Sequence, residues 1–202
     1  MDEYQDILDF WFGALDEDGM SDGAHRQLWF QSDPAFDQEL TRLFGADLQK
    51  AIKGQYDHWA DEPAGRVALL LLLDQFSRNI HRGTAQAFAQ DPLAQQLVEE
   101  GLSLGQDSTL PAAYRLFFYM PLMHAEDRAL QALGVDCFAR LAGQVPAAIK
   151  PIVDNSRRFA ELHQAIVDRF GRFPYRNKAL GRPDTAEESA WLVENPGGFG
   201  QA

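Results

Sequence analysis

Apolar residues recur at intervals of three and four positions along most of this chain, as in the series Phe36, Leu40, Leu43 and Phe44. This spacing places the apolar side chains on one face of an α-helix. The alternating, β-branched runs that indicate strands are nearly absent. The pattern therefore predicts an all-α protein, and we expect no strand.

Residues typical of helix starts divide the chain into segments. Three starts combine an acidic capping residue with a proline that suits the first helical turn: Asp33-Pro34, Asp61-Glu62-Pro63 and Asp91-Pro92. We expect eight or nine helices, with an error of about three residues at each end. Their approximate bounds are 2–15, 22–31, 34–53, 63–81, 92–104, 110–123, 125–143, 147–170 and 185–194.

The connections between these segments are short, and short connections force neighbouring helices to run antiparallel. We therefore expect a bundle or a stack of helical hairpins. No linker rich in Pro, Gly or Ser divides the chain. Residues 1–202 are accordingly expected to form a single domain around one hydrophobic core, with a short C-terminal tail at 195–202.

The stretch LLLLLDQFSRNIHRG, residues 69–83, contains the sharpest change in the pattern. Five leucines cover the whole circumference of the helix, which predicts burial, whereas the polar residues from Asp74 to Arg82 fall within one half of it. Asp74 and Arg78 have the spacing of an ion pair on one helix. Three interpretations follow: the helix emerges into solvent with an exposed ion pair, the polar side chains form a structural network, or they line a ligand site.

Two later segments carry similar polar residues. Pro121 stands in an apolar helical run and is expected to kink or divide it, just before His124 and Glu126. Further on, Arg176-Asn177 follows a break at Gly171 and Pro174, in a loop that could cap helix ends or hold an anion.

Charge is distributed unevenly along the chain. The 18 basic and 30 acidic residues give a net charge of −12, which disfavours nucleic acid and anionic membranes as partners. Between Arg157 and Arg182, however, seven basic residues face two acids, so this segment carries +5 and the remainder −17. Arginines outnumber lysines by 14 to 4, and arginine binds planar anions through paired donors.

Several classes of protein are disfavoured. Cys137 is the single cysteine, so no internal disulfide is expected, and we expect it to be a small core or half-buried residue. The start lacks the basic region of a signal peptide and no apolar run reaches membrane-spanning length, so a soluble cytoplasmic protein is expected.

His124, Glu126 and His163 lack metal-binding spacing, and nucleotide fingerprints are absent; we expect no metal and no cofactor.

Three motifs in order, DQFSRNIHRG (74–83), FFYMPLMHAED (117–127) and FGRFPYRNKALGRPDTAEE (170–188), together with the opening ILDFWFG (7–13), resemble the bacterial "domain of unknown function 924" family. The likeness covers nearly the whole chain. It implies an all-helical fold of the tetratricopeptide-like type, and it carries no established activity, so no residue acquires a role from it.

We hypothesise that these segments converge on one concave polar site that favours a small carboxylate or phosphate ligand, or an acidic peptide. The candidate binding residues are Asp74, Arg78, Asn79, Arg82, His124, Glu126, Arg172, Arg176, Asn177 and Arg182. Two alternatives stand beside this binding function. In a hydrolase-type enzyme, His124 or His163 would act with Glu126 in acid–base chemistry; in an interaction scaffold for a protein partner, the polar cluster would be purely architectural. The sequence leaves the oligomeric state open.

Overall fold

The apolar spacing of the sequence corresponds to helices along the whole chain. The computed structural model describes residues 3–30 and 33–197; within them there is no β-strand, and the all-α prediction is confirmed. The α-helices are α1 Gln5–Phe12, α2 Gly23–Leu28, α3 Pro34–Ile52, α4 Pro63–Leu70, α5 Ser77–Ile80, α6 Asp91–Ser103, α7 Ala112–Met123, α8 Arg128–Gln144, α9 Lys150–Phe170, α10 Asn177–Leu180 and α11 Ala186–Glu194. Short 3₁₀ turns lie at Asp57–Asp61, Ala85–Phe88, Gln106–Thr109 and Pro174–Arg176.

Each of the nine expected segments has a helical counterpart. The expected helix at 63–81 is a continuous run of α4, a π-helical segment and α5. The four-residue α10 is too short to produce a periodic pattern in the sequence. Of the expected tail at 195–202, the part from 198 onward lies outside the described residues.

Capping side chains hold several helix ends where the sequence places them. Asp33 accepts a hydrogen bond from the backbone N–H of Ala35 at the start of α3, and Thr185 forms a capping box with Glu188 at the start of α11. Asp91 behaves differently, because it is the first residue of α6 and its carboxylate bonds to arginine side chains. The prediction that Asp91 is a helix cap is therefore wrong.

The leucine run contains a π-helical segment, Leu71–Phe76, which winds more widely than an α-helix. The wider turn changes the angular positions of the side chains that follow it. Asp74 is 1% exposed and Arg78 is 5% exposed. The interpretation in which the helix emerges into solvent with an exposed ion pair is therefore wrong.

Pro121 lies inside α7, which ends two residues later at Met123. The next helix, α8, begins after Asp127, whose carboxylate caps it. The expected division of this stretch thus falls just after the proline. Cys137, on α8, is fully buried, as expected.

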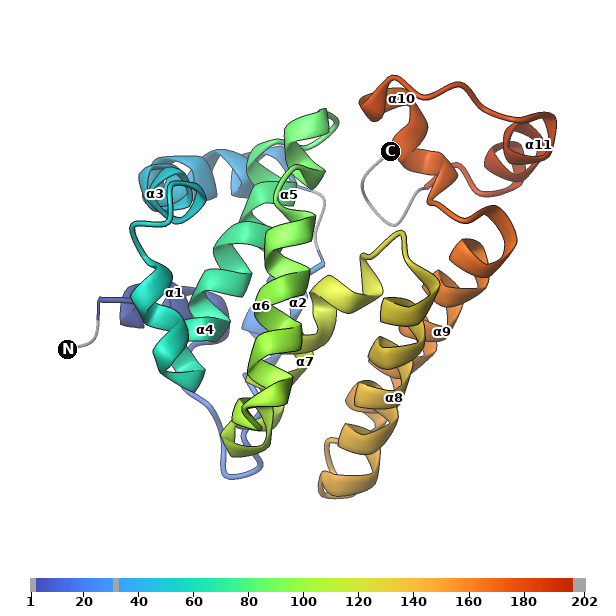
Figure 1. The fold of residues 1–202 in the computed structure, drawn as a ribbon. Coiled ribbons are helices and arrows are strands. Elements are labelled where there is room, and N and C mark those ends of the chain that lie inside the picture. Colours follow the sequence, from blue (N-terminus) through green and yellow to red (C-terminus); the bar gives the residue numbers. More distant parts are fainter. Residues whose placement is uncertain (1–2, 31–32, 198–202) are drawn as a thin grey trace.

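The helices form a central group with a hairpin on one side (Figure 1). α4 packs against both α6 and α7, and α1 and α3 cover this group on the side of the N-terminus. α8 and α9 form an antiparallel hairpin on the opposite side, and α7 packs against both. α10 and α11 follow α9 at the edge of the molecule farthest from the N-terminus. The packing agrees with the expected antiparallel hairpins, while the tetratricopeptide-like type remains a prediction.

Within the described part of the chain the buried apolar side chains form two clusters, whereas the sequence suggested one core. The larger cluster draws on helices from α1 to α9. The smaller one consists of Ile166, Val167, Phe173 and Tyr175, at the end of α9 and in the turn that follows. The chain reverses at Gly171, whose φ of 71° suits glycine, so the residues beyond it pack on the last turns of α9.

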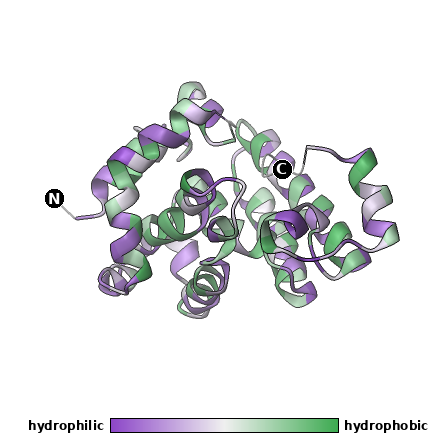
Figure 2. Cartoon of the chain, turned by 90° about the horizontal axis from the view of Figure 1, so that it is seen from above, coloured by the Kyte–Doolittle hydropathy of each residue, from purple (hydrophilic) through white to green (hydrophobic). Residues whose placement is uncertain are grey.

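The helices are amphipathic. Seen from above, hydrophobic and hydrophilic positions alternate along most of them (Figure 2). In the described part of the chain, none of the helices combines the length and the apolar character needed to cross a membrane.

Candidate functional site

The ten candidate binding residues are all buried or half-buried, and they gather around separate acids. The central network holds Asp74, Arg78, His124 and Arg176, the C-terminal cluster holds Glu126, Arg172, Asn177 and Arg182, and a third group holds Asn79 and Arg82.

Asp91 joins the central network. The Arg78 guanidinium donates to both of its carboxylate oxygens, at 2.8 and 2.9 Å, and Nη1 of Arg176 donates to Oδ2 at 3.0 Å. Paired bonds between a guanidinium and a carboxylate are among the strongest hydrogen bonds in proteins. Because Arg78 lies on α5, Asp91 begins α6 and Arg176 precedes α10, this carboxylate connects three segments that are distant in sequence.

Asp74 is the second acid of the central network, and the π-helical segment positions it. Its carboxylate accepts from Nη1 of Arg78 at 2.9 Å, from Nδ1 of His124 at 2.7 Å and from the side-chain amide of Gln75 at 2.5 Å. An ionised carboxylate can only accept, so Nδ1 of His124 carries the proton in this pair.

Arg176 is held on several sides. Its Nη2 donates to the backbone carbonyl of His124 at 2.9 Å. The ring centres of Phe88 and Phe173 lie 4.5 and 4.6 Å from the guanidinium carbon, within the range of cation–π contacts. Its Nε is buried and has no hydrogen-bond partner among the described residues. Arg176 therefore ties the C-terminal part of the chain to α6 and to the end of α7.

The charges of the central network balance. Burial raises the pKa of Asp74, but Arg78 and His124 together outweigh it, and the pKa lies at about 2. Burial lowers the pKa of His124, and Arg78 lowers it further against the opposing effect of Asp74. At neutral pH Asp74 is thus ionised and His124 is neutral, and the two aspartates of the network lie against two arginines.

His163 approaches the central network but bonds outside it. Its Nδ1 donates to the backbone carbonyl of Phe159 at 2.8 Å, and its ring centre lies 6.2 Å from that of His124. Burial, with a further contribution from His124, lowers the pKa of His163 to about 3. A neutral ring that donates from Nδ1 is consistent with these contacts.

Glu126 has different partners from those that the enzyme hypothesis requires. It accepts two hydrogen bonds from Arg182, at 2.6 and 2.8 Å, and one from the backbone N–H of Phe173 at 2.7 Å. Burial raises the pKa of Glu126, but its hydrogen bonds to Arg182 and Phe173 lower it by more. The pKa therefore lies below its usual value. Within the described residues, the acid that bonds to His124 is Asp74, and Glu126 bonds to neither His124 nor His163.

The remaining members of the C-terminal cluster also bond to acids. Arg172 donates to both oxygens of Glu188, at 2.7 and 2.8 Å. The side-chain amide of Asn177 donates to Asp184 at 2.7 Å. The bond to Arg172 is the main cause that lowers the pKa of Glu188, to about 2. This cluster therefore closes the loop between α10 and α11.

Asn79 and Arg82 point away from the other candidates, toward α3. Asp37 accepts from the side-chain amide of Asn79 at 2.8 Å, and from Nε and Nη2 of Arg82 at 2.7 and 3.0 Å. These bonds fasten the end of α5 to the first turn of α3.

Sequence reasoning named Asp74 and Glu126 but missed other acids of these groups, namely Asp37, Asp91 and Glu188. Asp91 has the signature of a helix cap, and Asp37 lies in the first helical turn, where an acid is common. The one available signal was the excess of arginine over lysine, which calls for matching carboxylates. The sequence does not show which acids supply them.

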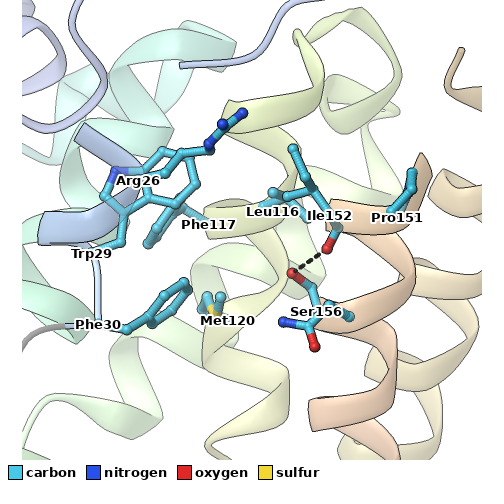
Figure 3. Close-up of a pocket in the computed structure, with 10 residues that line it drawn as sticks. Arg26, Trp29, Phe30, Leu116, Phe117, Met120, Pro151, Ile152 and Ser156 are labelled. Atoms are coloured by element: carbon cyan, nitrogen blue, oxygen red, sulfur yellow. Dashed lines mark hydrogen bonds between the residues drawn. The ribbon is translucent and has the colours of Figure 1, made fainter. Parts of the chain in front are cut away.

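A cavity of about 370 Å³ lies apart from all three groups, between α2, α7 and the start of α9. We call it the α2–α7–α9 pocket. Arg26, Trp29 and Phe30 stand on one side, and Pro151, Ile152 and Ser156 on the other (Figure 3). Its lining residues are Arg26, Trp29, Phe30, Leu116, Phe117, Met120, Pro151, Ile152, Asn155 and Ser156.

Aromatic packing fixes one wall of this pocket. The Trp29 indole donates to the backbone carbonyl of Trp11 at 2.8 Å, and its ring meets that of Phe117 edge-on at 4.8 Å. Phe30 stacks over Phe117 at 6.4 Å but remains 67% exposed. Trp29 and Phe117 are both buried, and the spacing of apolar residues in the sequence gives no sign that a hollow lies beside them.

Metal binding finds no support in the side-chain geometry. Across residues 3–30 and 33–197, no three His, Cys, Asp or Glu side chains gather in a way that would hold a metal ion.

The central network predicts a large stability effect for Arg176→Ala. Removing the guanidinium leaves the buried Asp91 with only Arg78, so we expect the free energy of unfolding to fall by about 3 kcal/mol. Arg169→Ala is the matched control, because its pair with Glu187 is more than half exposed; we expect a change below about 1 kcal/mol. Urea unfolding measures both, and equal losses would contradict a structural role for the network.

The buried histidines predict a dependence of stability on pH. His163 has a pKa of about 3 in the folded protein, whereas a histidine in the unfolded chain titrates near 6.5. The unfolded chain therefore binds more protons between these values, so stability is lost as the pH falls from 6.5 toward 3. Asp74 adds a loss below about pH 3.8, because its folded pKa is depressed to about 2.

His163→Gln should reduce the first of these losses. We expect the difference in unfolding free energy between pH 7.5 and pH 5 to shrink by up to about 2 kcal/mol. His58→Gln, at a ring that is 63% exposed, is the control. If the unfolding free energy of His163→Gln depends on pH as strongly as that of the wild type, the ring of His163 is not held neutral.

Comparisons with known proteins agree with the motifs and the fold. The family described as "Bacterial protein of unknown function (DUF924)" matches residues 7–197. The solved structure of a protein of unknown function, ATU0120 from Agrobacterium tumefaciens, is similar, with 37% sequence identity and a TM-score of 0.78, over 95% of this chain and 97% of that chain. No curated protein matches the chain. The chain therefore belongs to the bacterial family of unknown function DUF924.

Proposed function

We propose that this protein binds a small ligand in the α2–α7–α9 pocket, and that the central network and the C-terminal cluster hold the fold together. One contrast carries the proposal. The candidate arginines of the sequence analysis already bond to acids of the chain, whereas the pocket offers an apolar hollow with a few polar groups at its edge. Concave, mostly apolar sites with few polar groups are typical of small-molecule binding.

The pocket has the dimensions and surface of a binding site. Its volume of about 370 Å³ falls within the usual range for ligand sites. A ligand there would cover Phe30, whose ring is 67% exposed, and removing apolar surface from water is favourable. The fixed ring of Trp29 provides a preformed wall, which lowers the ordering cost of binding.

The anion-binding groove of the sequence analysis has weaker support. A carboxylate, a phosphate or an acidic peptide would have to compete with a carboxylate of the chain for each guanidinium, and uncovering a buried acid is costly. One observation favours this hypothesis, namely the buried Nε of Arg176, which has no hydrogen-bond partner among the described residues. The arginines concerned are Arg78, Arg82, Arg172 and Arg176.

A thermal-shift screen of small metabolites separates the two binding sites. A ligand of the pocket should raise the melting temperature of the wild type and lose this effect in Asn155→Trp, which places a ring over the pocket from an exposed position. Arg176→Ala should melt lower without ligand but keep the same rise. Glu161→Trp adds the same ring elsewhere on the exposed surface of α9 and is the control. A rise that vanishes in Arg176→Ala and persists in Asn155→Trp would place the ligand in the central network.

An acid–base enzyme is the second candidate, and the pair of His124 and Asp74 favours it. An aspartate that bonds Nδ1 leaves the Nε2 lone pair of a neutral imidazole available as a base, as in hydrolase triads. The His124 side chain is 15% exposed, and no described residue bonds to its Nε2. This arrangement replaces the pairing with Glu126 suggested by the sequence.

Turnover of chromogenic esters, amides and phosphates tests the enzyme candidate. If His124 is the base, His124→Gln should abolish any turnover above the buffer rate, while His163→Gln should retain it because the hydrogen bond of His163 Nδ1 goes to the backbone carbonyl of Phe159 and not to an acid. The pH profile should follow the titration of a single base. Equal rates in the wild type and His124→Gln would remove this candidate.

A further inference from the structure

The α2–α7–α9 pocket has one formal charge among its lining residues, the guanidinium of Arg26. Arg26 lies on α2, half-buried, and its side chain stands at the edge of the pocket beside Trp29 (Figure 3). The guanidinium has no ion-pair or hydrogen-bond partner among the described residues. In this respect it differs from Arg78, Arg172 and Arg176, each of which bonds to an acid.

From this juxtaposition we infer that the ligand of the pocket is a small monocarboxylic acid with an aromatic or branched aliphatic body, whose carboxylate pairs with Arg26. The inference rests on the proposed function, because it names the ligand class of the same site. Arginine matches a carboxylate through two parallel hydrogen bonds, and the remaining wall is mostly apolar. The two features together fit a molecule with one anionic end.

The interior of the pocket sets the shape of the apolar body. Phe117, Leu116 and Met120 of α7 line the hollow between its α2 side and its α9 side, where Ile152 stands. A single ring or a short branched chain fits about 370 Å³, whereas an extended peptide would need a longer groove. The size of the hollow therefore favours a compact molecule.

The charges around the pocket favour an anion over a cation. No acid lines the pocket, although the chain as a whole carries −12. The start of α9, a helix of 21 residues, also lies at the pocket, and the N-terminal end of a helix carries a partial positive charge. This field adds to the effect of Arg26, but the hollow and the unpaired guanidinium carry the inference.

Polar groups on the α9 side, opposite Arg26, are suited to a polar substituent on the body of the ligand. The Ser156 hydroxyl donates to the backbone carbonyl of Ile152 at 3.3 Å, a long bond that a ligand acceptor can replace. Asn155 lies at the same edge and is exposed. Both side chains are neutral, so the charge selectivity of the pocket depends on Arg26.

Isothermal titration with matched pairs of probes tests the inference. Each pair consists of an acid and its neutral amide: 3-phenylpropionate with its amide, indole-3-acetate with its amide, and 4-methylpentanoate with its amide. We expect the wild type to bind at least one acid about tenfold or more tightly than its amide, the usual size of a charge-assisted contribution. Arg26→Gln should abolish this preference and leave amide binding unchanged. Arg158→Gln, which removes an exposed arginine of α9 outside the pocket, should bind as the wild type does.

The outcomes separate the inference from the proposed function. If amides bind as well as acids, if Asn155→Trp blocks both and if Arg26→Gln changes neither, the pocket is a binding site and the carboxylate inference is overturned. If neither acids nor amides bind the wild type, or if Asn155→Trp leaves their binding intact, the pocket is not the site and both proposals fall. Circular dichroism and the melting temperature of Arg26→Gln should match the wild type, because the Arg26 side chain forms no hydrogen bond or ion pair with the described residues and its backbone bond to Asp22 is kept.

Discussion

Two guanidinium groups share one buried carboxylate in this protein, and the position of the C-terminal part of the chain depends on that arrangement. Asp91 receives both ends of Arg78 and one end of Arg176. Charges taken out of water carry a large desolvation cost, which is offset only when the geometry of the pair is good and the remaining donors are satisfied. A misplaced segment would leave a charge buried without a partner. The interaction therefore selects one arrangement of α5, α6 and the turn before α10 over the alternatives.

The two apolar clusters show why such a connection is needed. The smaller cluster, around Phe173 and Tyr175, is too small to hold α10 and α11 in place by itself. Arg176 emerges from this cluster and places its guanidinium against the ring of Phe88 and the carbonyl of His124, both in the larger part of the molecule. Polar bonds thus supplement apolar packing at the boundary between the clusters.

The pairing of arginines with acids from other segments explains why the chain has more arginine than lysine. The segment 157–182 carries an excess of positive charge that is neutralised by acids from other segments, among them Asp91 and Glu126. Arginine suits these positions because its planar guanidinium presents parallel N–H donors in a fixed geometry that matches a carboxylate, whereas the lysine ammonium is a point charge on a flexible stem. A local concentration of arginine is therefore a sign of internal pairing as much as of an anion site. The unpaired Arg26, isolated in the sequence, is the more informative cation for binding.

Much of the fold was accessible from the sequence because it depends on local physics. The recurrence of apolar residues every three or four positions predicts the helices, and capping residues such as Asp33 and Thr185 mark where helices start. Both signals act within a few residues along the chain. The motifs likewise identified Arg78, His124 and Arg176 as residues that come together, although not their arrangement.

The partners of those residues and the location of the hollow were decided only by the tertiary structure. Asp91 acts as a cap or as an ion-pair partner depending on what packs against it, and the sequence before it is the same in either case. The π-helical segment Leu71–Phe76 changes the direction in which the Asp74 side chain points, and the repeat of a regular α-helix does not predict this change. The pocket exists because α2, α7 and α9 leave space between them, and such a space is a property of three surfaces and not of any one segment. The sequence determined which helices form and which side chains are polar; their assembly determined which charges pair within the chain, because pairing depends on segments that are distant in sequence.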